Sequence, residues 1–281
     1  MVNYLKNLKD FGFKTDKKRF IIAEIGINHN GDIDTAKRLI DSASASGVDA
    51  VKFQTYITEK RVSEDSPIFD ILKKCELPFE AFENLKKHSK SCNVDFLSTP
   101  FDNESVDYLE SIGVDLYKIA SFDVTNHQFL RKVAALEKGI ILSVGLSDLS
   151  EIEDAYNVIS EYNKRIALLH CISAYPTEAK DANLGAICIM KERFDCVIGH
   201  SDHTDGIRIS EYAAVLGAQV IEKHYMISDD MECVDAPVSI TEKQMKALVE
   251  SISSIDDIIG EYKVKVTKAQ EFAKIFRRYS K

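Results

Sequence analysis

Two histidines stand at the ends of consecutive apolar segments in the second half of the chain. His203 follows the segment CVIGHS, inside the hexapeptide GHSDHT, and His224 ends the segment QVIEKH. If these segments are neighbouring parallel strands, their backbones lie about 4.8 Å apart, and two imidazoles at equal depth can reach one cation. Two nitrogen ligands with open coordination positions suit an exchangeable Mn²⁺, Fe²⁺, Co²⁺ or Zn²⁺ better than a closed structural site. The pair therefore predicts a divalent metal site.

The same hexapeptide contains a second histidine with a different prediction. His200 precedes Ser201, and because side chains alternate along a strand, it faces away from Ser201 and His203. We expect His200 to belong to the wall behind the site. Asp202 and Thr204 are expected to orient the turn and the imidazole of His203.

Lysines and hydroxyls form a further set at segment ends. Lysine supplies a point charge and hydroxyls supply short hydrogen-bond donors, which together suit a phosphate, or a phosphate with a carboxylate. The alternative is that both lysines are neutralised by carboxylates of neighbouring strands. The set consists of Lys52, Thr99, Lys118, Ser121, Ser143, Ser173 and Ser201.

These residues sit on a repeating two-part unit that begins at Phe20. Short apolar segments typical of buried parallel strands alternate with longer segments whose apolar residues recur at helical spacing. Eight such units predict an α/β fold, a (β/α)8 TIM barrel, with chemistry at the carboxyl ends of the strands. A doubly wound sheet is the alternative, but it would not require eight evenly spaced units. The expected strands are 20–28, 49–55, 94–99, 115–121, 139–145, 165–171, 196–201 and 219–224.

We expect one domain over residues 1–281. Residues 1–19 are predicted to form an N-terminal arm or hairpin that closes the lower end of the barrel, and residues 20–260 the barrel itself. Residues 261–281 are predicted to form an extra amphipathic helix packed against the outside. Residues 56–78 interrupt the regular alternation of predicted strands and helices. Long loops of this kind are often lids or substrate loops.

Composition limits the classes of function. The net charge is −9 and the basic residues are dispersed, which argues against a nucleic-acid surface. No apolar segment approaches the roughly 20 residues of a membrane span, and the N-terminus lacks the apolar core of a secretory signal. We therefore expect a cytoplasmic protein with no membrane association. The six cysteines show no CxxC spacing, which favours free thiols.

Seven sequence blocks occur in a fixed order: AEIGINHNGDIDTAKRLIDSASASGVDAVKFQ, STPFD, YKIAS, HCISAYP, NLGAI, GHSDHTDG and IEKHY. Over roughly residues 18–260 they resemble the sialic acid synthase (N-acetylneuraminate synthase) family, including its spore-coat-polysaccharide relatives. The resemblance implies an enzyme that condenses phosphoenolpyruvate with an aldose such as N-acetylmannosamine. The products are a sialic-acid-like 3-deoxy-2-keto sugar acid and phosphate, for surface polysaccharide biosynthesis.

The resemblance also implies roles for individual residues. His203 and His224 match the ligands of a divalent cation, Mn²⁺ before Mg²⁺ or Co²⁺, which polarises the aldehyde oxygen. The lysine–hydroxyl set matches the phosphoenolpyruvate site, where Lys118 also takes part in catalysis. Glu24 or Asp123 would stabilise positive charge at C2 or deprotonate the incoming water. The positions that match the sugar side of the site are Gln54, Tyr175 and Asp235.

The chain also departs from the family pattern. Members usually carry a C-terminal antifreeze-like domain that covers the partner subunit's barrel and supplies an arginine, and a chain ending at Lys281 has no room for it. A homodimer or a separately encoded lid domain is therefore an expected partner. Val144 replaces a threonine of the family, Ser173 an asparagine and Asp123 a glutamate. The Gly-Pro that usually precedes the position of Asp235 is missing from ECVDAPVS.

Two other functions stay open. A barrel without a lid makes fewer distal contacts, which fits a phosphoenolpyruvate-dependent aldol-type enzyme acting on a shorter aldehyde. The same feature fits a non-catalytic barrel, or a subunit that is active only with a separate lid protein.

Overall fold

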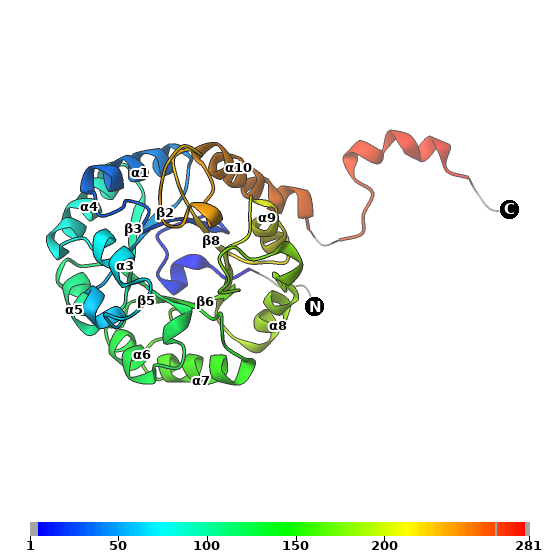
Figure 1. Cartoon of the computed structure of the whole chain (residues 1–281). Helices are drawn as coiled ribbons and strands as arrows, with labels where there is room; N and C mark the ends of the chain where they lie inside the picture. The colour runs from blue at the N-terminus through cyan, green and yellow to red at the C-terminus, as the bar shows by residue number, and fades with distance from the viewer. Residues whose placement is uncertain (1–4, 262, 279–281) are drawn as a thin grey trace.

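The computed structural model describes residues 5–261 and 263–278. Its centre is a closed barrel of eight parallel strands, each hydrogen-bonded to the next in chain order, with β8 closing on β1 (Figure 1). The TIM-barrel prediction is confirmed. The strands are β1 Phe20–Gly26, β2 Ala50–Thr55, β3 Asp95–Pro100, β4 Leu116–Ile119, β5 Gly139–Ser143, β6 Ile166–Cys171, β7 Val197–Asp202 and β8 Val220–His224.

Helices surround the barrel as an outer ring (Figure 1). Several begin where the sequence supplies a capping side chain, because a short polar side chain can accept a hydrogen bond from an unpaired backbone N–H of the first turn. Asp32, Asp102 and Asp148 do so at the starts of α1, α5 and α7. The ring consists of α1 Ile33–Ala45, α4 Phe79–Ser91, α5 Asn103–Ser111, α6 His127–Ala134, α7 Leu149–Ser160, α8 Gly185–Arg193, α9 Arg208–Val215 and α10 Glu242–Ile259.

Apolar side chains hold the barrel from two sides. One buried cluster lies between the strands and the ring of helices, and a second fills the barrel interior at the amino ends of the strands. The arm joins the second cluster through Leu8, on the short 3-10 helix η1 Leu8–Phe11, and through Phe13. The ring of Phe13 meets that of Phe20 edge-on, with centroids 4.9 Å apart. The arm therefore closes this end, and substrates must enter from the other.

Longer loops shape the open end. After β2 the chain forms two short helices, α2 Thr58–Arg61 and α3 Phe69–Cys75, within the excursion predicted from the sequence. After β8 a loop with the 3-10 helix η4 Ala236–Val238 leads to α10. Shorter 3-10 turns, η2 Ser121–Asp123 and η3 Ala179–Asp181, follow β4 and β6.

The C-terminal segment differs from its prediction. Residues 263–278 contain only the 3-10 helices η5 Lys268–Gln270 and η6 Phe272–Phe276, every one of these residues is exposed, and the segment extends away from the barrel (Figure 1). The predicted packing against the outside is wrong for this part; Tyr262 and residues 279–281 lie outside the described residues. Helix α10 packs between α9 and α1, and the exposed segment after it gains no burial that would stabilise a longer helix.

Within residues 5–261 and 263–278, no helix is both long and apolar enough to cross a bilayer.

Candidate active site

The candidate active site is a pocket of about 360 Å³ at the carboxyl ends of the strands. Every site residue predicted from the sequence lines it, except Asp123. The predicted residues brought together are Glu24, Lys52, Gln54, Thr99, Lys118, Ser121, Ser143, Ser173, Tyr175, Ser201, His203, His224 and Asp235.

Strand register explains why residues far apart in the sequence meet. On β1, Glu24 stands beside Lys52 of β2 and beside His224 of β8. Ser201 of β7 stands beside Glu222 of β8. Because side chains alternate along a strand, Glu222 and His224 share the inner face of β8. The backbone of the barrel thus holds four titratable side chains close together: Glu24, Lys52, Glu222 and His224.

Buried ion pairs connect the two lysines to two carboxylates. Lys52 Nζ lies 2.8 Å from Glu24 and 3.7 Å from Glu222, and Lys118 Nζ lies 3.6 Å from Glu222. Thr99 accepts a hydrogen bond from Lys52 (3.1 Å), and Ser201 donates one to Glu222 (2.8 Å). Carboxylates of neighbouring strands therefore pair with both lysines, as the alternative interpretation of the sequence expected. The hydroxyl groups expected to bind an anion line the same pocket.

The two carboxylates respond to this environment in opposite ways. Burial opposes ionisation of Glu222, yet Lys118 and Lys52 together hold its pKa well below the usual range. Burial raises the pKa of Glu24, and the single ion pair with Lys52 offsets this only in part. Glu222 is accordingly a fixed negative charge, whereas Glu24 is the group suited to exchanging a proton.

A glycine makes room for the hydroxyls on the opposite wall. The N–H of Gly145 donates a hydrogen bond to Ser121 Oγ (2.9 Å), and a Cβ on this residue would lie 2.5 Å from Ser173 Oγ. Ser143 Oγ is buried and has no hydrogen-bond partner among the described residues. Such a concentration of close hydroxyls, with one donor group unused, is suited to bind the oxygens of an anion.

The histidine pair lies beside these groups. His203 Nδ1 donates to the carbonyl oxygen of Ile172 (2.8 Å), so its Nε2 carries the lone pair. His224 Nδ1 is buried without a hydrogen-bond partner among the described residues and lies 3.4 Å from Asp235 Oδ2. The two ring centroids are 5.4 Å apart. Each ring thus has a nitrogen available, and the pair fits a shared divalent cation.

The pKa values agree with a site for positive charge. Burial and the neighbouring His224 lower the pKa of His203 to about 3, so that this ring is neutral, as a metal ligand must be. Burial acts in the same direction on His224, but Asp235 outweighs it and raises the pKa. The carboxylate beside His224 therefore favours a cation at this end of the pocket.

The back of β7 and β8 carries a separate polar cluster. Asp202 accepts hydrogen bonds from the N–H and hydroxyl of Thr204 and from the hydroxyl of Ser210, and forms an ion pair with Lys223 at 3.3 Å. These contacts fix the turn that holds His203, as expected for Asp202 and Thr204, but the imidazole itself is oriented by the carbonyl oxygen of Ile172. His200 Nδ1 donates to the carbonyl oxygen of His170 (3.0 Å), which places His200 in the wall.

Asp123 is the predicted site residue that the structure separates from the others. It lies at the end of η2, half-buried, and accepts a hydrogen bond from Asn126 (3.2 Å). The strand ends at Ile119, and Asp123 stands at the far end of the following 3-10 turn, outside the lining of the pocket. Its expected role at the reacting centre is not supported by its position, and Glu24 is left as the candidate carboxylate.

Two charged pocket residues had no role assigned from the sequence. Glu222 could have been found from its position two residues before His224, on the same face of the strand. Arg61 of α2 could not, because no periodic pattern places a side chain from a long excursion. Its guanidinium lies 3.7 Å above the ring of Phe101 and donates a hydrogen bond to Gln54 (2.9 Å).

Asp235 is positioned by a residue at the opposite end of the sequence. Asn28, just after β1, accepts a hydrogen bond from the N–H of Asp235 (2.9 Å) and donates one to the carbonyl oxygen of Tyr225 (3.0 Å). Gly26 has a φ of +56°, and a Cβ there would approach Glu24 at 3.1 Å and Asp235 at 3.3 Å. The missing side chain lets both carboxylates reach the pocket.

Comparison with known proteins finds several sugar acid synthases among the relatives. The chain is 40% identical over 272 residues to the N,N'-diacetyllegionaminic acid synthase of Campylobacter jejuni, covering 91% of this chain and 81% of that protein. It is 32% identical to the pseudaminic acid synthase of the same species, covering 93% of this chain and 82% of the relative.

Solved structures give the same result. The N-acetylneuraminic acid (sialic acid) synthetase from Leptospira borgpetersenii, crystallised with citrate, is 37% identical and superimposes with a TM-score of 0.88. The match covers 92% of this chain and 91% of that one. Residues 39–264 match the family described as the NeuB family. With more than half of the chain matched, and the barrel and pocket in place, this protein belongs to the NeuB family of sugar acid synthases.

Proposed function

We propose that this protein condenses phosphoenolpyruvate with an amino-aldose, of the N-acetylmannosamine type, to give a 3-deoxy-2-keto sugar acid and inorganic phosphate. The observation that carries the proposal is the meeting of a histidine pair and a lysine–hydroxyl cluster in one pocket. The names of the relatives, synthases of legionaminic, pseudaminic and N-acetylneuraminic acids, support this class of product.

Phosphoenolpyruvate would bind through its anionic groups. Its phosphate fits the hydroxyl wall around Gly145, and its carboxylate fits beside Lys52 and Lys118. In the free site these lysines are balanced by Glu24 and Glu222. Protonation of Glu24, which its raised pKa favours, would leave a net positive charge for the incoming anion.

A divalent cation would be held by His203 and His224. We propose Mn²⁺, with Mg²⁺ or Co²⁺ as alternatives, because nitrogen ligands and a nearby carboxylate suit these ions. When bound, the ion supplies Lewis-acid polarisation of the aldehyde oxygen. Asp235, 3.4 Å from His224 Nδ1, would orient this ring and favour the positive charge.

The protein's own residues would transfer the protons of the reaction. A carbon–carbon bond forms between C3 of phosphoenolpyruvate and the aldehyde carbon, and water adds to C2. Glu24, held by Lys52 at 2.8 Å and by Gln54 at 3.4 Å and protonated when phosphoenolpyruvate binds, would give its proton to the new alkoxide and then take a proton from this water. The C2–O bond to phosphate breaks, the C2 hydroxyl becomes the ketone, and its proton leaves with inorganic phosphate.

Sugar recognition would fall to the outer part of the pocket. Gln54, Tyr175 and Asp235 line it, together with Arg61. The guanidinium is held against Phe101, so it can present N–H donors to sugar or amide oxygens with little loss of conformational freedom.

The proposal can be tested with purified protein, phosphoenolpyruvate, Mn²⁺ and a panel of aldehydes from glyceraldehyde to acetylated hexosamines. We expect phosphate release only when an amino-aldose is present, and none with the His203→Ala variant. A preference for short aldehydes would show that the proposed acceptor is wrong. Binding of phosphoenolpyruvate without turnover across the whole panel would contradict the proposal that the protein is an enzyme.

A further inference from the structure

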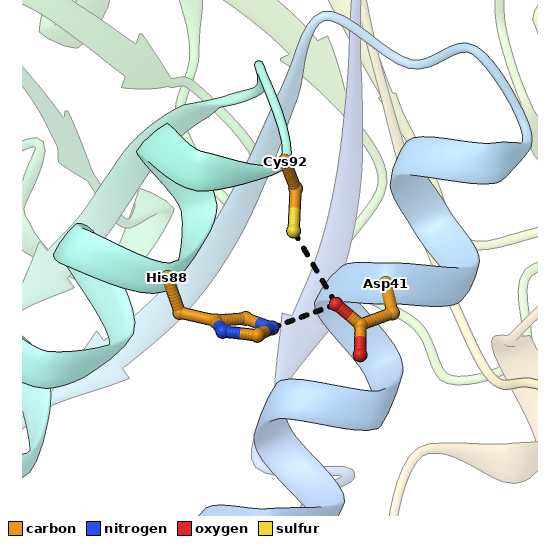
Figure 2. Close-up of side chains that lie close together, drawn as sticks. All are labelled: Asp41, His88 and Cys92. Atoms are coloured by element: carbon orange, nitrogen blue, oxygen red, sulfur yellow. Dashed lines mark hydrogen bonds and ion pairs between the residues drawn. The ribbon is translucent and has the colours of Figure 1, made fainter.

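Outside the pocket, three metal-binding side chains meet on the surface of the helical ring. They are Asp41 of α1, His88 of α4 and Cys92, the residue that caps the end of α4 (Figure 2). Asp41 Oδ1 lies 2.7 Å from His88 Nε2 and 3.3 Å from Cys92 Sγ. Their ligand atoms all lie within 4.8 Å of one another. A carboxylate, an imidazole and a thiol thus converge on one point.

The backbone brings these side chains together independently of any ligand. His88 and Cys92 are four residues apart and therefore lie on one face of α4. The neighbouring α1 packs against α4 and presents Asp41 to that face. A separate hydrogen bond, from Ser44 Oγ to the carbonyl oxygen of Cys92 (2.8 Å), ties the end of α4 to α1. The three groups are consequently held close before a cation arrives.

The chemistry of this set indicates its ligand. One carboxylate oxygen faces two donors, Nε2 of His88 and the thiol of Cys92, and a cation in their place would satisfy all three groups at once. In tetrahedral zinc sites, bond lengths of about 2.0–2.3 Å put the ligand atoms roughly 3.3–3.6 Å apart. The observed spacings need only small side-chain shifts to reach this geometry. A thiolate among the ligands selects Zn²⁺ over Mg²⁺, Ca²⁺ or Mn²⁺.

The position also suits a cation. Carbonyl groups at the end of α4 give this end a partial negative charge, which favours positive charge nearby. The side chains of Asp41 and His88 are 56% and 28% exposed, so a water molecule can complete the coordination. None of the three residues lines the catalytic pocket.

We propose that Asp41, His88 and Cys92 form a Zn²⁺ site that joins α1 to α4 on the outside of the barrel. Binding to the folded protein alone would raise the thermal midpoint as free Zn²⁺ increases. The site is independent of the proposed synthase activity, because its ligands are separate from His203 and His224.

The test uses Co²⁺ as a spectroscopic substitute for Zn²⁺, since thiolate coordination gives a sulfur-to-cobalt charge-transfer band. We expect this band in the full-length protein, its displacement by Zn²⁺, and its loss in Cys92→Ser. Asp41→Asn and His88→Gln should weaken Co²⁺ binding at least about tenfold, because each removes one of three ligands.

Two matched cysteine variants serve as controls. Cys188→Ser removes another half-buried free thiol, on α8, and should keep the band. Cys171→Ser removes the thiol that lies 3.8 Å from His203 Nδ1, and should keep it as well. A band that survives Cys92→Ser, one that disappears only with Cys171→Ser, or no band in the unmodified protein would overturn the proposal. Thermal melts without metal establish that each variant is folded.

Discussion

The inner and outer faces of β7 and β8 each carry a buried lysine–carboxylate ion pair. The two pairs have similar distances, but their carboxylates differ in hydrogen bonding. On the inner face, Lys118 pairs with Glu222 at 3.6 Å, and on the outer face, Lys223 pairs with Asp202 at 3.3 Å. Both oxygens of Asp202 accept hydrogen bonds from Thr204 or Ser210, whereas Glu222 has a buried oxygen without a hydrogen-bond partner among the described residues.

This difference separates a structural cluster from a functional one. Both oxygens of the outer carboxylate, Asp202, already have hydrogen-bond donors, so this ion pair serves the fold, although His200 Nε2 on the same face is buried without a partner among the described residues. The inner cluster keeps unused hydrogen-bonding capacity at Glu222, Ser143 and His224, all buried in a pocket. A buried ion pair alone therefore does not identify a site, and unsatisfied polar groups that also line a pocket are the more informative signal.

The largest effect is expected from the inner lysine. Lys118→Met removes a charge that would contact phosphoenolpyruvate, and should lower kcat/KM by at least about a hundredfold, as loss of a group that stabilises developing charge does. Glu222 keeps Lys52 as a partner, so the variant should still fold. Steady-state kinetics measures the loss in kcat/KM, and circular dichroism shows whether the variant is folded. Near-normal activity would mean that the inner cluster is structural too.

The outer lysine should instead affect stability. Lys223→Met leaves Asp202 as a buried charge without its cation, and we expect a loss of about 3–5 kcal/mol in the free energy of unfolding. Denaturant unfolding measures this, with Lys223→Met combined with Asp202→Asn as the control that removes both charges. If the single variant were as stable as the unmodified protein, the assignment of the outer pair as structural would be wrong.

The hydroxyl wall should affect substrate binding. In Gly145→Ala the new methyl group would lie 2.5 Å from Ser173 Oγ and 3.0 Å from Ser121 Oγ. Displacing these hydroxyls should raise KM for phosphoenolpyruvate roughly tenfold or more, since small misplacements of binding groups are costly. Gly185→Ala is the matched control, because no atom lies within 4 Å of the added group. Equal KM values for the two variants would rule out the proposed phosphate position.

A further effect on the outer face concerns pH. Burial opposes ionisation of Asp202, but Lys223, His200 and the hydrogen bond from Ser210 lower its pKa below 3.8. The stability gained is complete above this value and is lost as pH falls through the lower folded pKa. Ser210→Ala should cost about 1.5–3 kcal/mol at pH 7, and less in strong acid. A cost independent of pH would show that the hydroxyl acts through packing rather than through the carboxylate.

What could be predicted from the sequence follows from strand geometry. Period-two alternation puts Glu24, Lys52 and His224 on the inner face and His200 behind it, and parallel register brings them to one depth. Alternation fails at Asp123, because the chain has left the strand and turned into η2.

Features outside the strands depend on tertiary contacts that no local pattern encodes. Arg61 reaches the pocket because Asp102 and Glu76 hold the start of α2 through hydrogen bonds to Ile57 and Thr58. Asp235 is placed by Asn28, 207 positions away. The apolar residues after Val264 predicted a packed helix, but residues 263–278 are all exposed, and no local pattern shows whether such a segment finds a surface to pack on.

The most direct test of the distinction between the two faces is Mn²⁺ binding to a pair of single-histidine variants, measured by electron paramagnetic resonance. His203 lines the pocket, and His200 donates to the backbone of β6 behind it. We predict that His200→Ala binds one Mn²⁺ with nearly the affinity of the unmodified protein, and that His203→Ala loses at least about a hundredfold in affinity. Equal loss in both variants, or no loss in His203→Ala, would contradict the assignment of the inner face as the metal site.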